Sequence, residues 1–234
     1  MRRENFIALL SVAAAAAVVS GCASVATNTS HTFETVVLDA GHGGKDSGAV
    51  RRYSPAEKTL ALDVTLRVNR KLQESQLQTV LTRANDTFIP LDDRVARGNA
   101  EKNSIFVSIH FNDSRRRAVR GFETYYHSPY AFELASAIER KLDTLPHSEN
   151  RGVRTARFRV LRNAQYPSVL VECGYLSNRS EGSRVSNSGY RDEVADKIAE
   201  AIVDYRYGTG MYARQPAVVA ARSGRTNPFA PAFQ

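Results

Sequence analysis

Short apolar runs alternate with longer segments of helical periodicity through most of this chain. An apolar run of about four to eight residues bounded by glycine or polar residues is typical of a buried strand, whereas apolar positions that repeat every three to four residues indicate an amphipathic helix. The strand-like runs cover residues 35–39, 78–82, 105–111, 121–126 and 168–172. The helical patterns cover residues 57–74, 91–101, 130–145 and 190–207. This alternation predicts a single three-layer α/β domain, with a twisted, mostly parallel or mixed sheet of about six strands flanked by helices on both faces.

The second helical pattern carries a start signal of its own. Asp86 or Thr87 is a candidate N-cap one turn before the pattern, and Pro90 follows them. Because proline is favoured at the first position of a helix, we expect this helix to begin near Leu91.

The first 22 residues differ in composition from the rest of the chain. Arg2 and Arg3 precede an uncharged run, residues 5–20, that is rich in Ala and Val. This run is shorter than the ~20 apolar residues that a membrane-spanning helix needs, and it is typical of a secretory signal peptide. The small residues that end at Cys22 resemble a bacterial lipoprotein lipobox, which implies cleavage before Cys22 and lipidation of its thiol. The alternative is an ordinary signal peptide cut nearby, with Cys22 idle or removed.

These features divide the chain into four parts. We predict a lipoprotein signal peptide over residues 1–21, a tether with lipidated Cys22 over 22–32, a catalytic domain over 33–207 and a disordered tail over 208–234. Ala23 follows the cysteine, which by the best-known sorting pattern of such lipoproteins favours the outer membrane. The expected location is therefore the cell envelope, with the domain facing the periplasm.

The chain is basic, with a formal net charge of +8 at neutral pH. This balance suits an anionic partner such as a cell-wall polymer or lipid headgroups, and secretion takes the protein away from nucleic acid. Once Cys22 is assigned to the anchor, only Cys173 remains, so no intramolecular disulfide can form. Four arginines between two predicted strands belong to a loop that is either solvated or in contact with an acidic polymer: Arg115, Arg116, Arg117 and Arg120.

Two histidines and a glutamate stand where predicted strands end. His42 lies in a glycine-rich loop after the first strand, His110 near the end of the third, and Glu172 at the end of the fifth. Ligands in open α/β sheets bind beyond the carboxyl ends of strands, so we expect these three side chains to share one crevice. A carboxylate buried there needs a cation, a proton or solvent nearby, and a metal ion supplies the cation.

Zinc fits this set best, because it accepts imidazole and carboxylate ligands and a catalytic zinc site keeps about three protein ligands and a water. The two histidines therefore need an acidic third ligand. Glu57 is a candidate because it opens the helix after the glycine loop, and Asp39 and Asp46 compete with it by proximity. An acid at a helix start also interacts favourably with the helix dipole without any metal. Spacing alone therefore leaves the third ligand open.

Five segments together carry a resemblance to a known family. In chain order they are DAGHGGKDSGA, the acid of AEK at Glu57, VSIHFND, GFETYYHS and VLVECGYLSN. Their order and spacing resemble the zinc-dependent N-acetylmuramoyl-L-alanine amidases of bacteria and phages, with a type 3 amidase domain, over residues 35 to about 207. The resemblance implies one Zn²⁺ per chain, ligated by His42, Glu57 and His110, with Glu172 as the catalytic carboxylate.

The same resemblance implies a reaction and its partners. A zinc-activated water, with Glu172 as general base, would hydrolyse the amide between N-acetylmuramic acid and L-alanine of the peptidoglycan stem peptide. This activity would serve cell-wall remodelling, division or recycling. Some relatives carry an inserted helix that blocks the zinc until a partner removes it, but the connections after Asn112 and Tyr126 are too short for one. We therefore expect no obligatory activator, and peptidoglycan and the membrane as partners.

Two other functions fit parts of the sequence. Cys173 with His42 or His110 as base would make a thiol hydrolase, although strand alternation turns Cys173 away from Glu172. A non-catalytic envelope lipoprotein would bind peptidoglycan with no need for a metal or for Glu172. Inactivation by chelators, together with resistance to alkylating reagents, would separate a zinc amidase from both.

Overall fold

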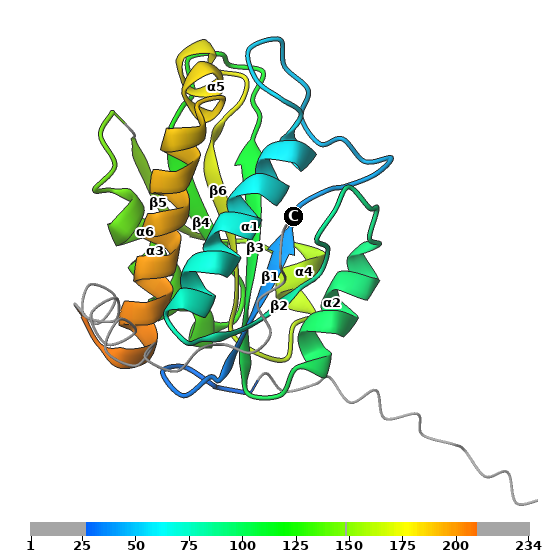
Figure 1. Cartoon of the computed structure of the whole chain (residues 1–234), viewed down its shortest axis with the longest axis vertical. Helices are drawn as coiled ribbons and strands as arrows, with labels where there is room; N and C mark the ends of the chain where they lie inside the picture. Colours follow the sequence, from blue (N-terminus) through cyan, green and yellow to red (C-terminus); the bar gives the residue numbers. More distant parts are fainter. Residues whose placement is uncertain (1–26, 148, 210–234) are drawn as a thin grey trace, which may run out of the picture.

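A computed structural model of the chain describes residues 27–147 and 149–209. Cys22 and most of the expected C-terminal tail lie outside these residues. In the described part, six strands form one sheet in the order β2-β1-β3-β6-β4-β5 (Figure 1). Their bounds are β1 Thr35–Ala40, β2 Gln78–Leu81, β3 Ser104–Asn112, β4 Phe122–Tyr126, β5 Asn150–Thr155 and β6 Ser168–Tyr175.

The sheet is mixed. β4 runs antiparallel to β6 and β5 runs parallel to β4, whereas β2, β1, β3 and β6 are parallel to one another. The carboxyl ends of β1, β3 and β6 therefore meet at one edge of the sheet. β5 has no counterpart among the predicted strands, because its sequence NRGVRT is polar and carries no apolar run. The predicted fold class, an open mixed sheet between helices, is confirmed.

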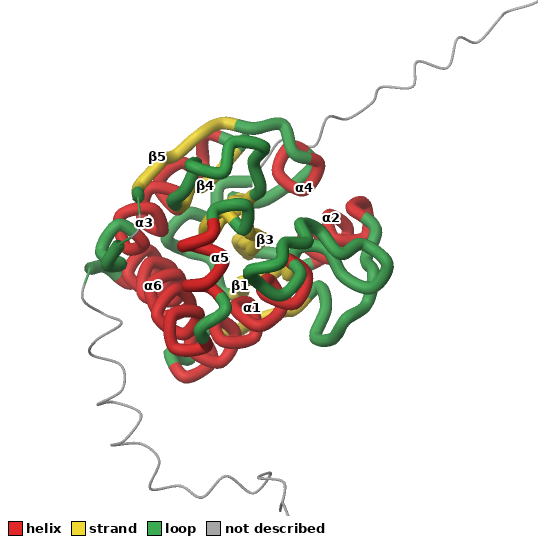
Figure 2. The backbone as a smooth tube through the Cα atoms, turned by 90° about the horizontal axis from the view of Figure 1, so that it is seen from above, coloured by secondary structure: helices red, strands yellow, loops and turns green. Residues whose placement is uncertain are grey.

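Helices cover the two faces of the sheet unequally (Figure 2). α1 and α3 each pack against α6 on one face, and α2 and α4 cover part of the other. The short α5 lies near the carboxyl end of β6 (Figure 1). Their bounds are α1 Glu57–Glu74, α2 Leu91–Ala100, α3 Phe132–Leu142, α4 Arg159–Arg162, α5 Arg179–Val185 and α6 Ser188–Tyr207, with a 3₁₀ turn Pro129–Ala131 before α3.

The hydrophobic core is correspondingly one-sided. Leu38 of β1 belongs to the large buried cluster under α1, α3 and α6, whereas the preceding Val37 belongs to a small cluster on the opposite face with Phe106 and Val160. This division follows from the alternation of side chains along a strand. The face under α2 and α4 thus holds few apolar side chains, and polar groups can occupy the rest of it.

α2 begins at Leu91 as expected, but the predicted N-cap is wrong. Pro90 is the residue before the first turn, and no side chain caps this helix end. Asp86 has different partners: its carboxylate accepts hydrogen bonds from the backbone N–H of Gly44 at 2.7 Å and from Nζ of Lys58 at 2.6 Å. Asp86 therefore fixes the glycine loop after β1 instead of capping a helix.

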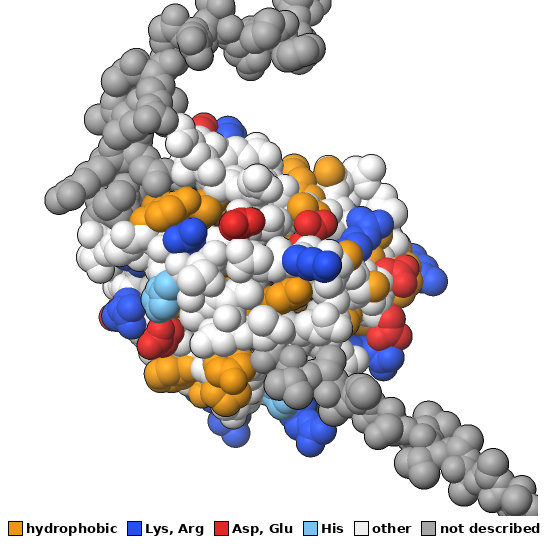
Figure 3. Space-filling view, turned by 90° about the horizontal axis from the view of Figure 1, so that it is seen from below, with side chains coloured by type: hydrophobic (Ala, Val, Ile, Leu, Met, Phe, Trp, Pro, Cys, Tyr) orange, Lys and Arg blue, Asp and Glu red, His pale blue; other side chains and the backbone are white. Residues whose placement is uncertain are grey.

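Contacts with the domain begin before Phe33. The backbone N–H of Thr27 donates to the carbonyl oxygen of Gln165 at 2.6 Å, and Oγ1 of Thr29 donates to that of Ser104 at 2.6 Å. These acceptors lie at the starts of β6 and β3, so the described chain begins at the end of the sheet opposite to the carboxyl edge. Seen from that end, acidic and basic side chains are interspersed (Figure 3). Of the helices described, none is long and apolar enough to span a bilayer.

Candidate metal centre

His42 is positioned by the loop that follows β1. Its backbone has a φ of 60°, a left-handed conformation that strains a non-glycine residue and persists only where the surroundings fix it. The carboxylate of Asp46 accepts a hydrogen bond from Nδ1 of His42 at 2.8 Å. Because this bond fixes the ring, Nε2 is directed toward the sheet edge, where it lies 2.9 Å from Oε1 of Glu57.

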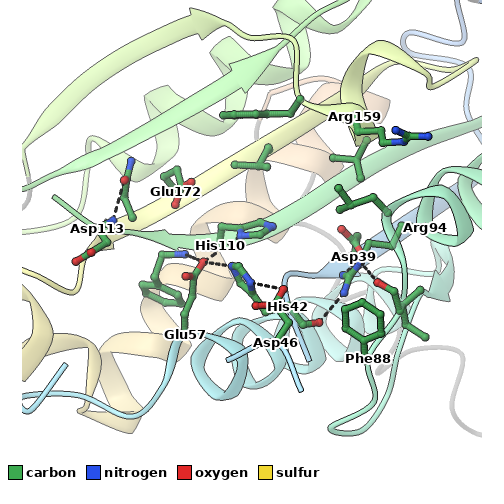
Figure 4. Close-up of a pocket in the computed structure, with 17 residues that line it drawn as sticks. Asp39, His42, Asp46, Glu57, Phe88, Arg94, His110, Asp113, Arg159 and Glu172 are labelled. Carbon is green, nitrogen blue, oxygen red and sulfur yellow. Dashed lines mark hydrogen bonds and ion pairs between the residues drawn. The ribbon is translucent and has the colours of Figure 1, made fainter. Parts of the chain in front are cut away.

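Glu57 is the first residue of α1 and is 5% exposed. Its Oε1 lies 3.0 Å from Nδ1 of His110, and its Oε2 accepts a hydrogen bond from the backbone N–H of Ala49 at 2.9 Å. Burial acts to raise the pKa of this carboxyl, but the hydrogen bonds from His110 and His42 outweigh burial and the pKa is lowered. Glu57 is therefore a carboxylate held between two imidazoles (Figure 4).

His110 comes from β3, the strand beside β1. Gly41 lies directly against its ring, and a Cβ atom at position 41 would overlap the imidazole. The register of the sheet places His110 beside Glu172 of β6. Glycine at position 41 is thus required by the close approach of the loop to the ring.

These three side chains could together hold a metal ion. One nitrogen from each of His42 and His110 and one oxygen of Glu57 lie within 4.8 Å of one another. Burial acts to lower the pKa of His42, but Glu57 and Asp46 raise it by more, so the surroundings favour positive charge at this point. Two imidazoles and a carboxylate match the donor set of catalytic zinc sites. The chemistry of the residues present therefore fits zinc.

Glu172 faces the same cavity from β6. The cavity has a volume of about 710 Å³ and is lined by the three potential ligands and by Glu172. Oε2 of Glu172 is buried and has no hydrogen-bond partner among the described residues. Burial, and after it the charges of Glu57 and Glu123, raises the pKa of Glu172 well above its ordinary value. A carboxyl group in this state requires a proton or a cation beside it.

Glu123 of β4 is the neighbour of Glu172 across the sheet. The two residues are paired across β4 and β6, and Glu123 is 2% exposed. Its Oε1 accepts hydrogen bonds from Nδ2 of Asn112 at 2.8 Å and from the hydroxyl of Tyr175 at 2.6 Å, and its Oε2 lies 3.1 Å from Nε of Arg154. The neighbouring carboxylate is therefore fully partnered, in contrast to Oε2 of Glu172.

The two aspartates that compete with Glu57 in the sequence have other partners. Asp39 is 1% exposed, and its carboxylate accepts hydrogen bonds from three buried side chains, those of Thr82, Arg94 and Ser108. Asp46 contacts His42 from the side opposite to Glu57. The geometry thus brings Glu57, and neither aspartate, against both histidines.

Two buried arginines support the loop that carries His42, and neither was predicted from the sequence. Arg94 of α2 donates to the carbonyl oxygens of Ala40 and His42, each at 2.6 Å. Arg83 donates to the carbonyl oxygens of Ala40 at 2.9 Å and Gly41 at 2.7 Å. Each arginine is 3% exposed. A signal existed for Arg94, since it stands within the apolar stripe of its helix, where a charged side chain must find buried partners.

Cys173 lies on the other face of the sheet from this cavity. It is 3% exposed and belongs to the large hydrophobic cluster under α1, α3 and α6. Burial, with the charges of Glu172 and Glu139, raises the pKa of its thiol well above the ordinary value. Since a nucleophilic cysteine needs a lowered pKa and access to its base, the geometry excludes the thiol hydrolase.

A family model described as N-acetylmuramoyl-L-alanine amidase matches residues 36–204. The chain belongs to the N-acetylmuramoyl-L-alanine amidase family. The resemblance inferred from the five sequence segments is therefore confirmed. N-acetylmuramoyl-L-alanine amidase LytC of Bacillus subtilis is 39% identical over 176 residues, which cover 74% of this chain and 35% of LytC. The chain thus spans about a third of the length of that relative.

Solved amidase structures have the same fold. The catalytic domain of CwlV, an N-acetylmuramoyl-L-alanine amidase from Bacillus (Paenibacillus) polymyxa var. colistinus, is 39% identical with a TM-score of 0.70, and the match covers 74% of this chain and 98% of CwlV. The amidase AmiC2 of Nostoc punctiforme is 39% identical with a TM-score of 0.71, over 73% of this chain and 96% of AmiC2. About three quarters of this chain thus correspond to nearly the whole of each of those two solved chains.

Proposed function

We propose that this amidase is a zinc-dependent peptidoglycan hydrolase that cleaves the amide between N-acetylmuramic acid and the L-alanine of the stem peptide. The observation that carries the proposal is the buried, unpartnered Oε2 of Glu172 in the same cavity as the group formed by His42, Glu57 and His110. Family membership supports the bond that is cut. The donor set supports the metal.

Each residue has a defined part in this proposal. A zinc ion held by His42, Glu57 and His110 would polarise a carbonyl and lower the pKa of a water. Glu172 accepts a proton from the attacking water and delivers it to the leaving nitrogen of L-alanine. Its buried surroundings suit this part, because they raise its pKa toward the range in which one group can both accept and release a proton.

The direct test is release of stem peptide from purified peptidoglycan by the zinc-loaded protein, with and without a chelator. Release should stop when zinc is removed and return when zinc is restored. Glu172→Gln should retain zinc and lose about 10²–10⁴-fold in turnover, because the group that moves the proton is gone. Substantial turnover by this variant would remove Glu172 from the mechanism. Absence of release by the zinc-loaded wild type would instead favour a non-catalytic peptidoglycan-binding lipoprotein.

We further propose that the enzyme needs no activator. In the described part of the chain, no helix lies between the end of β3 at Asn112 and the start of β4 at Phe122, and the cavity beside His110 is lined by residues of the domain itself. The purified protein should therefore release peptide without any added protein. Release that begins only after addition of a second envelope protein would contradict this proposal.

The proposed location is the periplasmic face of the outer membrane, through a lipid on Cys22. Its support is the lipobox-like sequence that ends at Cys22 and the alanine that follows it. Mass spectrometry of the mature protein should find acyl chains on an N-terminal Cys22. A mature N-terminus without lipid would exclude the anchor and leave the hydrolase proposal intact.

A further inference from the structure

The cavity extends well beyond the metal group on one side. There it becomes an apolar arm, lined by six side chains from α2, α4, β6 and the segments before the two helices: Phe88, Ile89, Leu91, Phe158, Val160 and Leu170. Figure 4 shows Phe88 and Arg159 on one side of His42 and His110, and Asp113 on the other. The two directions away from the metal group therefore have different chemistry.

Three side chains of the apolar arm remain open to solvent. Phe88 is 37% exposed, Phe158 42% and Leu91 54%. Large apolar side chains exposed along a concave wall mark a surface that a ligand covers. Two ion pairs lie at this arm. Arg159 and Asp92 form a two-point pair with Nη2 and Oδ2 at 2.7 Å, and Nη1 of Arg94 lies 2.7 Å from Oδ1 of Asp39. Nζ of Lys45 lies 4.5 Å from the centre of the Phe88 ring. The arm thus presents mainly apolar surface, with one lysine over Phe88.

On the opposite side of the metal group, the chain that leaves the cavity carries a run of arginines, called the arginine rim. The exposed Arg115, Arg116 and Arg117 follow Asp113, which lines the cavity, and no acidic partner is found for them among the described residues. Nδ2 of Asn178 donates to the carbonyl oxygen of Arg117 at 3.0 Å, which holds the loop against the start of α5. Three uncompensated guanidinium groups at one rim favour an anionic ligand.

The substrate named in the proposed function has the matching asymmetry. On one side of the scissile amide lies a glycan whose sugar rings are uncharged and present C–H faces and acetyl methyl groups. On the other side lies a stem peptide with free carboxylates. We propose that the glycan binds in the apolar arm between α2 and α4 and that the stem peptide runs over the arginine rim. This inference rests on the proposed function and adds the direction in which the substrate lies.

The apolar arm is tested with the double variant Phe158→Ala/Leu91→Ala. Its matched control is Phe132→Ala/Leu66→Ala, which removes the same two side-chain types at 49% and 37% exposed positions that do not line this cavity. Two substrates are compared, a disaccharide-peptide and a lactyl-peptide with the same stem but no sugar. For the disaccharide-peptide, KM should rise about tenfold in the arm variant, because apolar contact area is lost, and kcat, zinc content and the control should change little. For the lactyl-peptide, KM should be unaffected.

The arginine rim is tested with Arg115→Gln/Arg116→Gln/Arg117→Gln and with stem peptides whose carboxylates are free or amidated. KM for the free form should rise about fivefold, as expected for exposed charge pairs, and the amidated form should show no change. The matched control removes three exposed arginines from α1, α3 and α4: Arg70, Arg140 and Arg162.

Three outcomes would overturn the proposed direction. An equal rise in KM of the apolar-arm variant for the disaccharide-peptide and the lactyl-peptide would place the peptide in the apolar arm. A change in KM of either variant that is no larger than that of its control would show that the altered surface binds neither part of the substrate. An equal change in KM of the arginine variant for the free and the amidated peptide would show that the arginine rim does not bind the carboxylates. These outcomes differ from failure of the proposed function, in which the wild type cleaves none of the substrates.

Discussion

His42 holds its position against its own backbone preference. The left-handed φ of 60° is unfavourable for a residue with a Cβ atom, so contacts with the surrounding structure must hold it. Arg94 donates hydrogen bonds to the carbonyl oxygens of Ala40 and His42. Arg83 donates one to the carbonyl oxygen of Gly41. The position of His42 therefore depends on two guanidinium groups that are not among the proposed metal ligands.

This arrangement predicts that Arg94 determines metal affinity. In Arg94→Lys the ammonium can still pair with Asp39, but it lacks the planar fork that reaches the carbonyl oxygens of Ala40 and His42. Zinc affinity, measured by competition with a chelator of known strength, should fall about 10- to 100-fold, the range seen when the partners of ligands are altered.

Arg97→Lys is the matched control for this prediction. Arg97 is an exposed residue of the same helix and donates to the carbonyl oxygen of Thr82, away from the His42 loop. It should leave zinc affinity unchanged. If Arg94→Lys binds zinc as tightly as the wild type, the loop holds His42 without help from α2.

Single site residues were predicted best from the sequence where a histidine or glutamate follows an apolar strand-like run. His42 follows β1, and His110 and Glu172 lie two and three residues before the ends of β3 and β6. The crevice that they share could therefore be inferred from the apolar runs that precede them. The acidic third ligand of the metal could not be chosen from spacing, because Glu57, Asp39 and Asp46 are all near His42 in the chain. Partners such as Arg83 and Glu123 were beyond reach, since their contacts cross between distant segments and leave no periodic signal.

At the scale of elements, β5 is attached to the sheet through α3 as well as through β4. Glu139 of α3 is 4% exposed, and its two oxygens accept hydrogen bonds from the hydroxyl of Thr124 in β4 at 2.7 Å and from the backbone N–H of Gly152 in β5 at 2.9 Å. Burial raises the pKa of Glu139 to about 7. One carboxyl group thus ties a helix to the two strands at this end of the sheet.

The raised pKa predicts a pH dependence of stability. Between about pH 4.5 and 7 the folded state keeps a proton on Glu139 that the unfolded state releases, so the contribution of this group is fully present below about pH 4.5 and is lost as the pH rises through 7. The free energy of unfolding, measured with denaturant, should fall by on the order of 3 kcal/mol across this interval.

Glu139→Gln should flatten that part of the pH profile, because the amide does not titrate. Glu193→Gln, at an exposed position of α6, should retain the slope of the wild type. A slope that is identical in Glu139→Gln and the wild type would assign the pH dependence to other groups.

The elements that sequence predicted correctly are those with a strong apolar period. The strands β1, β3 and β6 and the helices α1 and α6 are buried on one or both sides, so their apolar positions reveal them. β5 was missed because it is a polar edge strand, held by contacts such as that of Glu139 with Gly152. α4 and α5 were missed because they are too short to show a helical period.

At the scale of the whole molecule, metal binding and folding should be coupled. The three proposed ligands come from a loop, a helix and a strand that are brought together only in the folded chain, so zinc would bind the folded state in preference. At a free zinc concentration of about 100 times Kd, the free energy of unfolding should rise by ~2.7 kcal/mol. Calorimetry should therefore show a lower unfolding temperature after chelation.

His110→Ala provides the control for this coupling. It removes a ligand and should make the unfolding temperature independent of zinc and chelator. If chelation does not change the unfolding temperature of the wild type, then His42, Glu57 and His110 hold no metal ion that stabilises the fold.

Because helices cover the two faces of the sheet unequally, substitutions in the hydrophobic core and substitutions in the cavity wall affect different faces. Most of the packing that keeps the domain folded lies under α1, α3 and α6, whereas the cavity lies on the face shared by α2 and α4. Substitutions along the cavity wall therefore draw on few of the contacts that stabilise the domain. Such a domain can diverge in the cell-wall material that it accepts while its scaffold stays the same, and selection can alter specificity in small steps that each leave a folded protein.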